Sequence, residues 1–126
     1  MNRKMWRALN QTKGTTLCER LEIAETRAAQ NKGLLGRDGL EPGCGMQFDN
    51  RSFLPVMWMH MFFMRFAIDI VFVDKSDRVI RINHRLRPWR LSSMVFGARR
   101  ALELEAGAAA RASTAPGDVL RFEVSE

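Results

Sequence analysis

The sequence predicts a mainly β protein: a compact antiparallel β sandwich or partly open barrel of about seven strands with one or two short helices, or, in another description, an α+β fold. Turn signals recur about every ten residues, which is the spacing of short strands joined by tight turns. Between the turns, apolar and polar residues alternate, as in strands that bury one face. The length of 126 residues suits one domain, and we expect residues 1–126 to form it, with 1–14 as an extra N-terminal strand or arm.

The first half of the chain contains two predicted strands and a short helix. Leu17, Leu21 and Ile23 alternate with polar residues and predict a half-buried strand. Thr26 is a suitable N-cap for a helix over 27–32, and the glycine that follows is a suitable stop. Four glycines and a proline in 36–45 indicate a loop, after which a strand restarts.

The second half contains the candidate central strand, Ile68–Val73, whose apolar and β-branched residues predict that both of its faces are covered. Residues 75–78 are its expected hairpin turn. Two later segments, 80–83 and 102–105, alternate leucine or isoleucine with polar residues, and each pattern predicts a strand with one wet face. One or two helical turns are expected within 106–112, and a closing strand over 120–124.

Composition indicates a folded and basic protein. Hydrophobic residues make up 46% and charged residues 27%, and the net charge is +6. The basic residues are sixteen arginines and four lysines, and the arginine fork binds carboxylate or phosphate. Solvated surface arginines, favoured by the codon usage of a GC-rich genome, are the other explanation.

Several patterns predict a cytoplasmic, soluble protein without a membrane partner. Residues 1–14 contain no apolar stretch of signal-peptide length. The most apolar window, Leu54–Val73, is interrupted by His60, Arg65 and Asp69, so it is not expected to span a membrane. In a reducing compartment, the unclustered Cys18 and Cys44 are expected to be free thiols.

Three blocks of residues, in order along the chain, carry a resemblance to a known family. The first block comprises Gly33, Leu34, Leu35, Gly36, Arg37, Leu40, Gly45, Met46 and Phe48. The second comprises His60, Phe62, Phe63, Met64, Arg65, Phe66, Ile68, Asp69, Val71, Phe72 and Asp74, followed by Arg87, Pro88, Trp89 and Arg90. The third comprises Leu102, Glu103, Leu104, Ala106, Gly107, Pro116, Gly117 and Asp118.

Over residues 17–122, this ordered set resembles one branch of the prokaryotic family catalogued as domain of unknown function 192. The resemblance implies a compact, mainly antiparallel β fold with short helices, and no established activity, cofactor or catalytic residue. Two positions depart from the branch, which has Pro at the place of Ala67 and a small hydroxyl residue at the place of Met61.

The first candidate site lies in the segment Met57–Asp69. Along a strand, Met57, Met59 and Met61 would face one side, as core packing, and Trp58, His60 and Phe62 the other. His60 is then either a hydrogen-bonded core histidine or a polar group in a pocket.

Arg65 and Asp69 lie four residues apart in the same apolar run, and buried charges persist only when they are paired. They form either a structural ion pair or a site in which Asp69 holds Arg65 toward an anionic ligand. Glu103, between two leucines, could join either arrangement.

The second candidate site is the run from Arg78 to Arg100, which contains seven arginines and no acidic residue. Pro88 stiffens the segment and leaves Trp89 between two arginines. Either Trp89 stacks on a base while the arginines contact phosphate, or it covers the sheet and the arginines are solvated. The predicted contact set is Arg81, Arg85, Arg87, Trp89 and Arg90.

Enzyme signatures are missing from the sequence. It contains no phosphate-binding loop, dinucleotide glycine pattern, nucleophile elbow or paired-histidine metal motif, so we expect no metal or cofactor and assign no catalytic residue.

The sequence favours a non-enzymatic binding domain with a pocket for a small anionic ligand, formed by Trp58, His60, Arg65, Asp69 and Glu103. One alternative is a nucleic-acid or acidic-protein adaptor that binds polyanions weakly through the Arg78–Arg100 region. Another is a hydrolase of unknown substrate with His60 and Asp69 as its acid/base pair.

Overall fold

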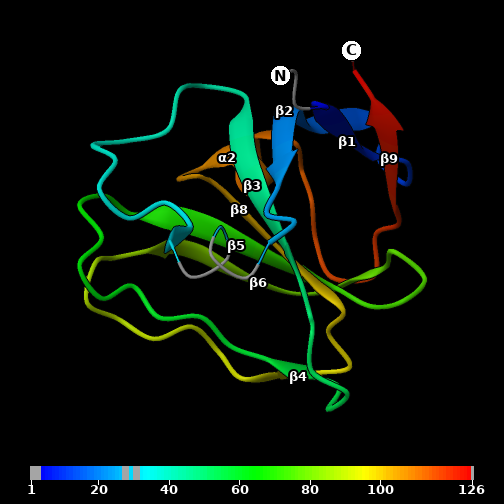
Figure 1. The fold of residues 1–126 in the computed structure, drawn as a ribbon. Helices are drawn as coiled ribbons and strands as arrows, with labels where there is room; N and C mark the ends of the chain where they lie inside the picture. Colours follow the sequence, from blue (N-terminus) through cyan, green and yellow to red (C-terminus); the bar gives the residue numbers. More distant parts are fainter. Residues whose placement is uncertain (1–3, 27–28, 30–31, 126) are drawn as a thin grey trace.

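Nine strands and one short helix make up the regular structure of the part of the chain that the computed structural model describes, residues 4–26, 29 and 32–125 (Figure 1). The strands are β1 Trp6–Asn10, β2 Thr15–Ile23, β3 Cys44–Asp49, β4 Val56–Met57, β5 Ile68–Val73, β6 Val79–Leu86, β7 Val95–Phe96, β8 Arg100–Glu105 and β9 Leu120–Val124. The helix, α2, spans Ala108–Arg111. The predicted mainly β class is confirmed.

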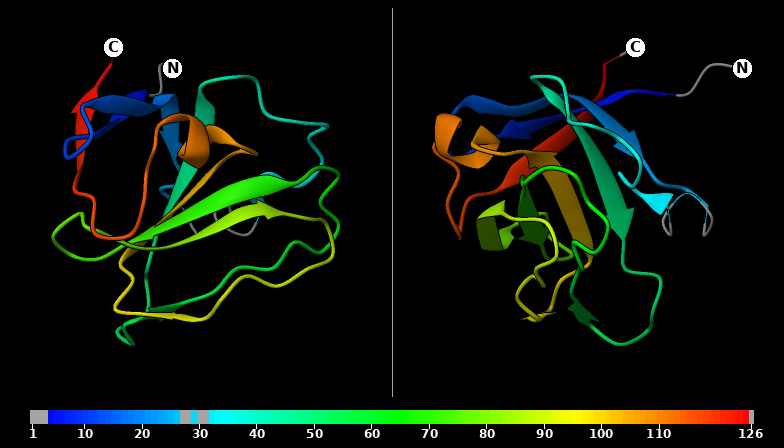
Figure 2. Two further views of the ribbon diagram at one scale, coloured as in Figure 1. Left: turned by 180° about the vertical axis from the view of Figure 1, so that it is seen from behind. Right: turned by 90° about the vertical axis from the view of Figure 1, so that its left-hand side faces the viewer.

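Seven strands form one sheet in the order β6-β5-β8-β3-β2-β1-β9, while β4 and β7 pair separately. All neighbours in the large sheet are antiparallel except β2 and β3, which are parallel. At one end the edge strands approach each other: Gly117 N donates to Val79 O, and Leu120 N to Asp77 O, both at 2.8 Å. The sheet therefore curls into a half-barrel (Figure 2).

Strand β5 is buried along its whole length, as its sequence predicted, because each of its faces meets a different core. Val71 and Val73 belong to the core inside the curl, together with Leu102, Leu104 and the alanines of α2. Ile68, Ile70 and Phe72 belong to a second core on the opposite face, under the segment 57–66. The hairpin turn expected at 75–78 is present, with Asp77 N donating to Asp74 O at 3.0 Å.

Strand β8 differs from the prediction, which gave it one wet face. Its leucines lie in the inner core, and the opposite side, which includes Glu103, is covered as well. Glu103 is 6% exposed. The prediction is wrong here because strand alternation shows which residues share a face and does not show whether a distant loop covers that face.

The helix predicted over 27–32 lies largely outside the described residues, which omit 27, 28, 30 and 31. The predicted cap is consistent with one described contact, in which Ala29 N donates to Thr26 Oγ1 at 2.9 Å. The turns expected within 106–112 are present as α2. Within the described ranges, no helix has the length and apolar character needed to cross a membrane.

Candidate functional site

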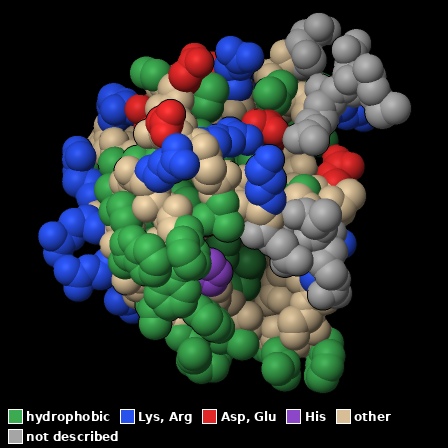
Figure 3. Space-filling model, turned by 60° about the vertical axis from the view of Figure 1, so that its left-hand side comes forward, with side chains coloured by type: hydrophobic (Ala, Val, Ile, Leu, Met, Phe, Trp, Pro, Cys, Tyr) green, Lys and Arg blue, Asp and Glu red, His purple; other side chains and the backbone are tan. Residues whose placement is uncertain are grey.

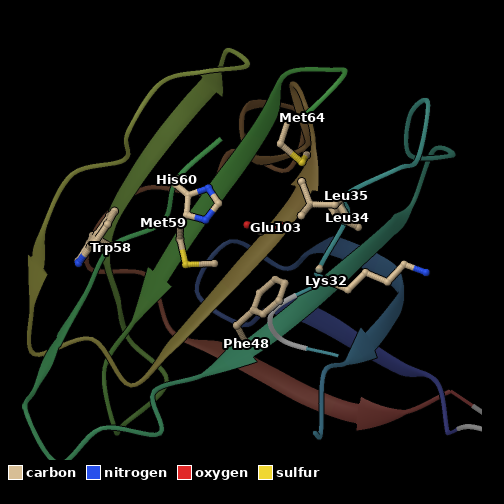
Figure 4. Close-up of a pocket in the computed structure, with 10 residues that line it drawn as sticks. Lys32, Leu34, Leu35, Phe48, Trp58, Met59, His60, Met64 and Glu103 are labelled. Carbon is tan, nitrogen blue, oxygen red and sulfur yellow. The ribbon is translucent and has the colours of Figure 1, made fainter. Parts of the chain in front are cut away.

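A pocket opens on the second core, between the sheet and two segments, 32–35 and 58–64 (Figure 4). Its volume is about 350 Å³. Leu34, Leu35, Phe48, Met59 and Met64 supply most of its apolar wall. Three ionisable residues also line it, namely Lys32, His60 and Glu103, and Trp58 stands at one side.

Glu103 lies at the centre of the pocket in Figure 4, where its oxygen faces the cavity. Strand pairing places Met46 of β3 and Ile70 of β5 on either side of it, so its neighbours in the sheet are apolar. Among the described residues it has no hydrogen-bond or ion-pair partner. Burial raises the pKa of Glu103 from 4.5 to about 8, because ionisation would leave a charge out of contact with water. At neutral pH the Glu103 carboxyl group is therefore mostly protonated.

His60 lies on the segment that forms the outer wall of the pocket. Backbone hydrogen bonds fix this segment against residues 90–92. Met61 N donates to Arg90 O, and Ser92 N to Met59 O, both at 2.8 Å. Nδ1 of His60 accepts a hydrogen bond from Phe62 N at 3.2 Å, which leaves Nε2 as the proton-bearing nitrogen of the neutral ring. His60 is exposed, so it is not a core histidine.

Of the five residues predicted to form one pocket, the structure brings Trp58, His60 and Glu103 together and separates the other two. Arg65 points to solvent, with its side chain 60% exposed, and pairs with Asp38 at 2.7 Å. The structure therefore contains neither of the two predicted arrangements, the Arg65–Asp69 ion pair or a site in which Asp69 holds Arg65 toward a ligand.

Asp69 faces the inside of the curl and is completely buried. Its carboxylate accepts hydrogen bonds from Arg85 N at 2.8 Å, Gly107 N at 3.2 Å and Ala109 N at 3.0 Å. The Arg85 N–H is available because the register of β5 with β6 shifts between Ile68 and Ile70, which leaves this group out of the regular strand pairing. Asp69 thus joins β5, β6 and α2, and the predicted acid/base pair with His60 does not form because they lie on opposite faces of the sheet.

Gly107 shows how tightly this junction is packed. Its φ is +95°, and a Cβ atom there would lie 2.8 Å from an Arg85 nitrogen. Arg85 itself adopts φ 50 and turns its side chain toward Gly107. The sequence analysis placed Arg85 in one contact set with Arg87, Trp89 and Arg90. In the structure its side chain turns away from them, toward Gly107.

The remainder of the basic run divides between two environments. Arg100 pairs with Asp77 at 2.5 Å, and Arg78 donates to Gly117 O at 2.8 Å. Arg81, Arg87 and Arg90 are exposed, and within the described residues none has an ion-pair partner.

Trp89 is 59% exposed and lies in a cluster of rings with Phe62 and Phe63. Its ring centre is 4.8 Å from that of Phe63, and Phe62 in turn stacks on His60 at 4.9 Å. Trp89 and Phe63 both have positive φ values, of 67° and 65°, which are strained for bulky side chains. Figure 3 shows hydrophobic side chains gathered on this side of the molecule, with basic side chains at their margin.

Sequence reasoning missed most of the pocket wall. Leu34, Leu35, Phe48 and Met64 were named only as members of the blocks that carry the family resemblance, and not as lining a pocket. Lys32 carried no signal beyond its place near the end of the predicted helix. Over the described ranges, no three His, Cys, Asp or Glu side chains are grouped so that they could hold a metal ion.

A second hollow, of about 530 Å³, lies near β2 and α2 and differs in its polar groups. Its Glu105 carboxylate accepts hydrogen bonds from Gly43 N at 2.8 Å and Arg111 at 2.6 Å. Because these internal partners satisfy Glu105, the first pocket with its unpartnered Glu103 is the stronger candidate site.

Comparison with known proteins gives relatives of uncharacterised function. A protein of Thermococcus sibiricus named UPF0127 protein is 30% identical over 118 residues, which are 94% of this chain and 75% of the relative. A UPF0127 protein of Thermococcus gammatolerans is 27% identical over 120 residues, covering 94% and 76%.

Two crystal structures share the fold. A protein of unknown function from Novosphingobium aromaticivorans is 28% identical with a TM-score of 0.77, over 93% of this chain and 83% of that one. A chain from Sinorhizobium meliloti, described as a proposed transcription regulator, has a TM-score of 0.80 at 23% identity, over 96% and 94%, and shows the fold alone. The family model of DUF192, whose description is Uncharacterized ACR, matches residues 8–122. The chain therefore belongs to the DUF192 family.

Proposed function

We propose that this protein is a non-enzymatic binding domain that holds a small molecule in the pocket around Glu103. One observation carries the proposal: a carboxyl group that is 6% exposed faces a cavity of about 350 Å³ and has no partner among the described residues. A buried polar group without a partner costs stability, so a site that retains one is suited to a ligand that supplies the missing partner. The apolar wall would bury the rest of that ligand.

The anionic ligand expected from the sequence depended on Arg65. Because Arg65 pairs with Asp38 outside the pocket, that expectation loses its main support. The proposal keeps the pocket and replaces the predicted arginine with the Glu103 carboxyl group as its principal polar contact.

A screen of small amines, alcohols and carboxylic acids against ¹⁵N-labelled protein tests this function. Binding should shift the Trp58 indole signal and the backbone signals of His60 and Glu103. Leu35→Trp, which adds bulk to the wall, should abolish these shifts. Leu54→Trp is the matched control, because Leu54 is exposed and does not line the pocket. If no compound of any class shifts the pocket signals, the proposed function is wrong.

A second candidate function is binding of single-stranded nucleic acid. It is favoured by the exposed rings of Trp89 and Phe63, 4.8 Å apart, beside Arg87 and Arg90, which have no ion-pair partner within the described chain. Exposed rings can stack on bases while the arginines contact phosphate. The interaction should be weak and should fade steeply with salt, because counterion release drives it.

Fluorescence titration with oligothymidylate at several salt concentrations measures this binding. Arg87→Ala with Arg90→Ala should weaken it and reduce the salt dependence, whereas Arg20→Ala with Arg121→Ala, on β2 and β9, should change it little. Equal losses in both double variants would show that general positive charge is responsible and that the Trp89 surface is not a site. Equal binding of polyglutamate would favour an acidic-protein adaptor.

A further inference from the structure

The charge inside the pocket identifies the chemical class of its ligand. Resting on the proposed function, we propose that the ligand is a small amine, whose ammonium group pairs with the Glu103 carboxylate while its apolar body fills the cavity. Glu103 is aimed into the pocket, is 6% exposed and has no partner in the described part of the chain.

Two strands, β3 and β5, and two segments, 32–35 and 58–64, pack around Glu103. On β3 and β5 the groups that face it are apolar, since Met46 and Ile70 are its neighbours in the sheet. Segment 32–35 contributes Lys32, and segment 58–64 contributes His60. Both are exposed and neither bonds to Glu103, and in Figure 4 the Lys32 side chain extends away from the Glu103 oxygen. Among the residues that the structure describes, the interior of the pocket therefore has a single charge-bearing group, and it is acidic.

An ammonium group satisfies this site better than the alternatives. An ionised carboxylate in an apolar cavity is costly unless a cation accompanies it, and an ammonium supplies charge and hydrogen-bond donors together. A ligand carboxylate would add a second negative charge, which an arginine fork does not offset here because Arg65 lies outside. Phe48, Trp58 and the thioethers of Met59 and Met64 suit the methylene groups and rings beside an ammonium.

The pairing makes binding depend on pH in a direction that identifies the ligand class. Glu103 must lose its proton to pair with an ammonium, and its pKa of about 8 means that most empty pockets are protonated at pH 6. The affinity of an amine should rise about tenfold per pH unit between pH 6 and 7 and level off above pH 8. A neutral ligand should show no such rise, and a carboxylate should bind more weakly as Glu103 ionises.

Phenethylamine, phenethyl alcohol and phenylacetate form a matched set of probes, with the same ring and different polar ends. Their dissociation constants would be measured by NMR titration of the intact protein from pH 6 to pH 8. We expect phenethylamine to bind most tightly at pH 8 and its affinity to fall by more than tenfold at pH 6. Preferential binding of the alcohol or of phenylacetate in the pocket would overturn the amine class while leaving the proposed function intact. No pocket shifts with any of the three probes would also overturn the amine class, whereas the proposed function fails only if the wider screen of amines, alcohols and carboxylic acids gives no shifts either.

Two substitutions assign the effect to Glu103. Glu103→Gln keeps the shape of the side chain and removes its charge, so amine binding should weaken more than tenfold at pH 8 and lose its dependence on pH. Glu105→Gln is the matched control, because Glu105 lies on the same strand but bonds to Gly43 and Arg111. His60→Gln should retain the rise between pH 7 and 8. If Glu103→Gln binds the amine as the parent does, the proposal is wrong.

Discussion

The protonated state of Glu103 predicts how the stability of the folded protein changes with pH. In the unfolded chain the carboxyl group loses its proton near pH 4.5, whereas the folded protein retains it until about pH 8. Between these values the folded state binds more protons than the unfolded state, so raising the pH favours unfolding. The contribution of Glu103 to stability is therefore most favourable below pH 4.5 and is lost as the pH rises to about 8.

The size of the effect follows from that difference. Each pH unit between the two pKa values is worth about 1.4 kcal/mol, so the free energy of unfolding should decrease by roughly 3 kcal/mol between pH 5 and pH 8 through Glu103 alone. Glu103→Gln removes this dependence because an amide does not titrate. The variant should match the parent within about 1 kcal/mol at pH 5 and exceed it by roughly 3 kcal/mol at pH 8.

Urea unfolding of parent and variant at pH 5, 6, 7 and 8 measures the difference, with slopes compared so that a change in midpoint reports stability. Other carboxyl groups titrate in both proteins, so their contributions cancel when the two are subtracted. If the two stability curves run parallel from pH 5 to pH 8, Glu103 ionises normally. Glu103 would then not be a buried carboxyl group without a partner.

Three further outcomes test other parts of the structure. Asp69→Asn should lower the free energy of unfolding by about 3 kcal/mol, because an amide cannot accept all three backbone N–H groups and brings a donor toward them. Urea unfolding measures this loss. A loss below about 1 kcal/mol would show that Asp69 does not hold β5, β6 and α2 together. Arg65→Ala should lower the free energy of unfolding by less than about 1 kcal/mol, since Arg65 and its partner Asp38 are both exposed. In the double variant with Asp69→Asn, the two losses should add. Strong coupling between them would support the Arg65–Asp69 ion pair that the sequence suggested. Thiol titration should find two free thiols per denatured chain. In the native state Cys18 should react slowly, since burial raises its pKa to about 12. Rapid labelling of both Cys18 and Cys44 would show that the core around Cys18 opens.

The sequence predicted features that depend on local pattern. The buried strand Ile68–Val73 is recognisable because five of its six residues are apolar and most of these are β-branched, which is typical of a strand covered on both faces. The alternation in 57–62 also matches the structure, with Met57 and Met61 buried and Trp58 and His60 exposed.

Features that depend on distant contacts could not be predicted in the same way. The partner of Asp69 was sought four residues away, whereas its donors lie 16 to 40 residues along the chain. Glu103 appeared to be on a wet face because the segment that covers it, 57–64, is about forty residues earlier in the sequence. The parallel pairing of β2 with β3 is likewise set by a crossover, and alternation carries no information about strand direction.

The pairing of β1 with β9 has a consequence for how the protein acquires its structure. Trp6 lies opposite Val124, so β1 completes its pairing only with β9, a strand that is synthesised long after it. During synthesis, β1 can form a hairpin with β2 while its other edge stays open to wrong partners. Folding that depends on such distant pairing is expected to be slow, on the millisecond-to-second scale of β proteins. The hydrogen bonds that close the sheet would then be the latest to acquire protection from solvent exchange.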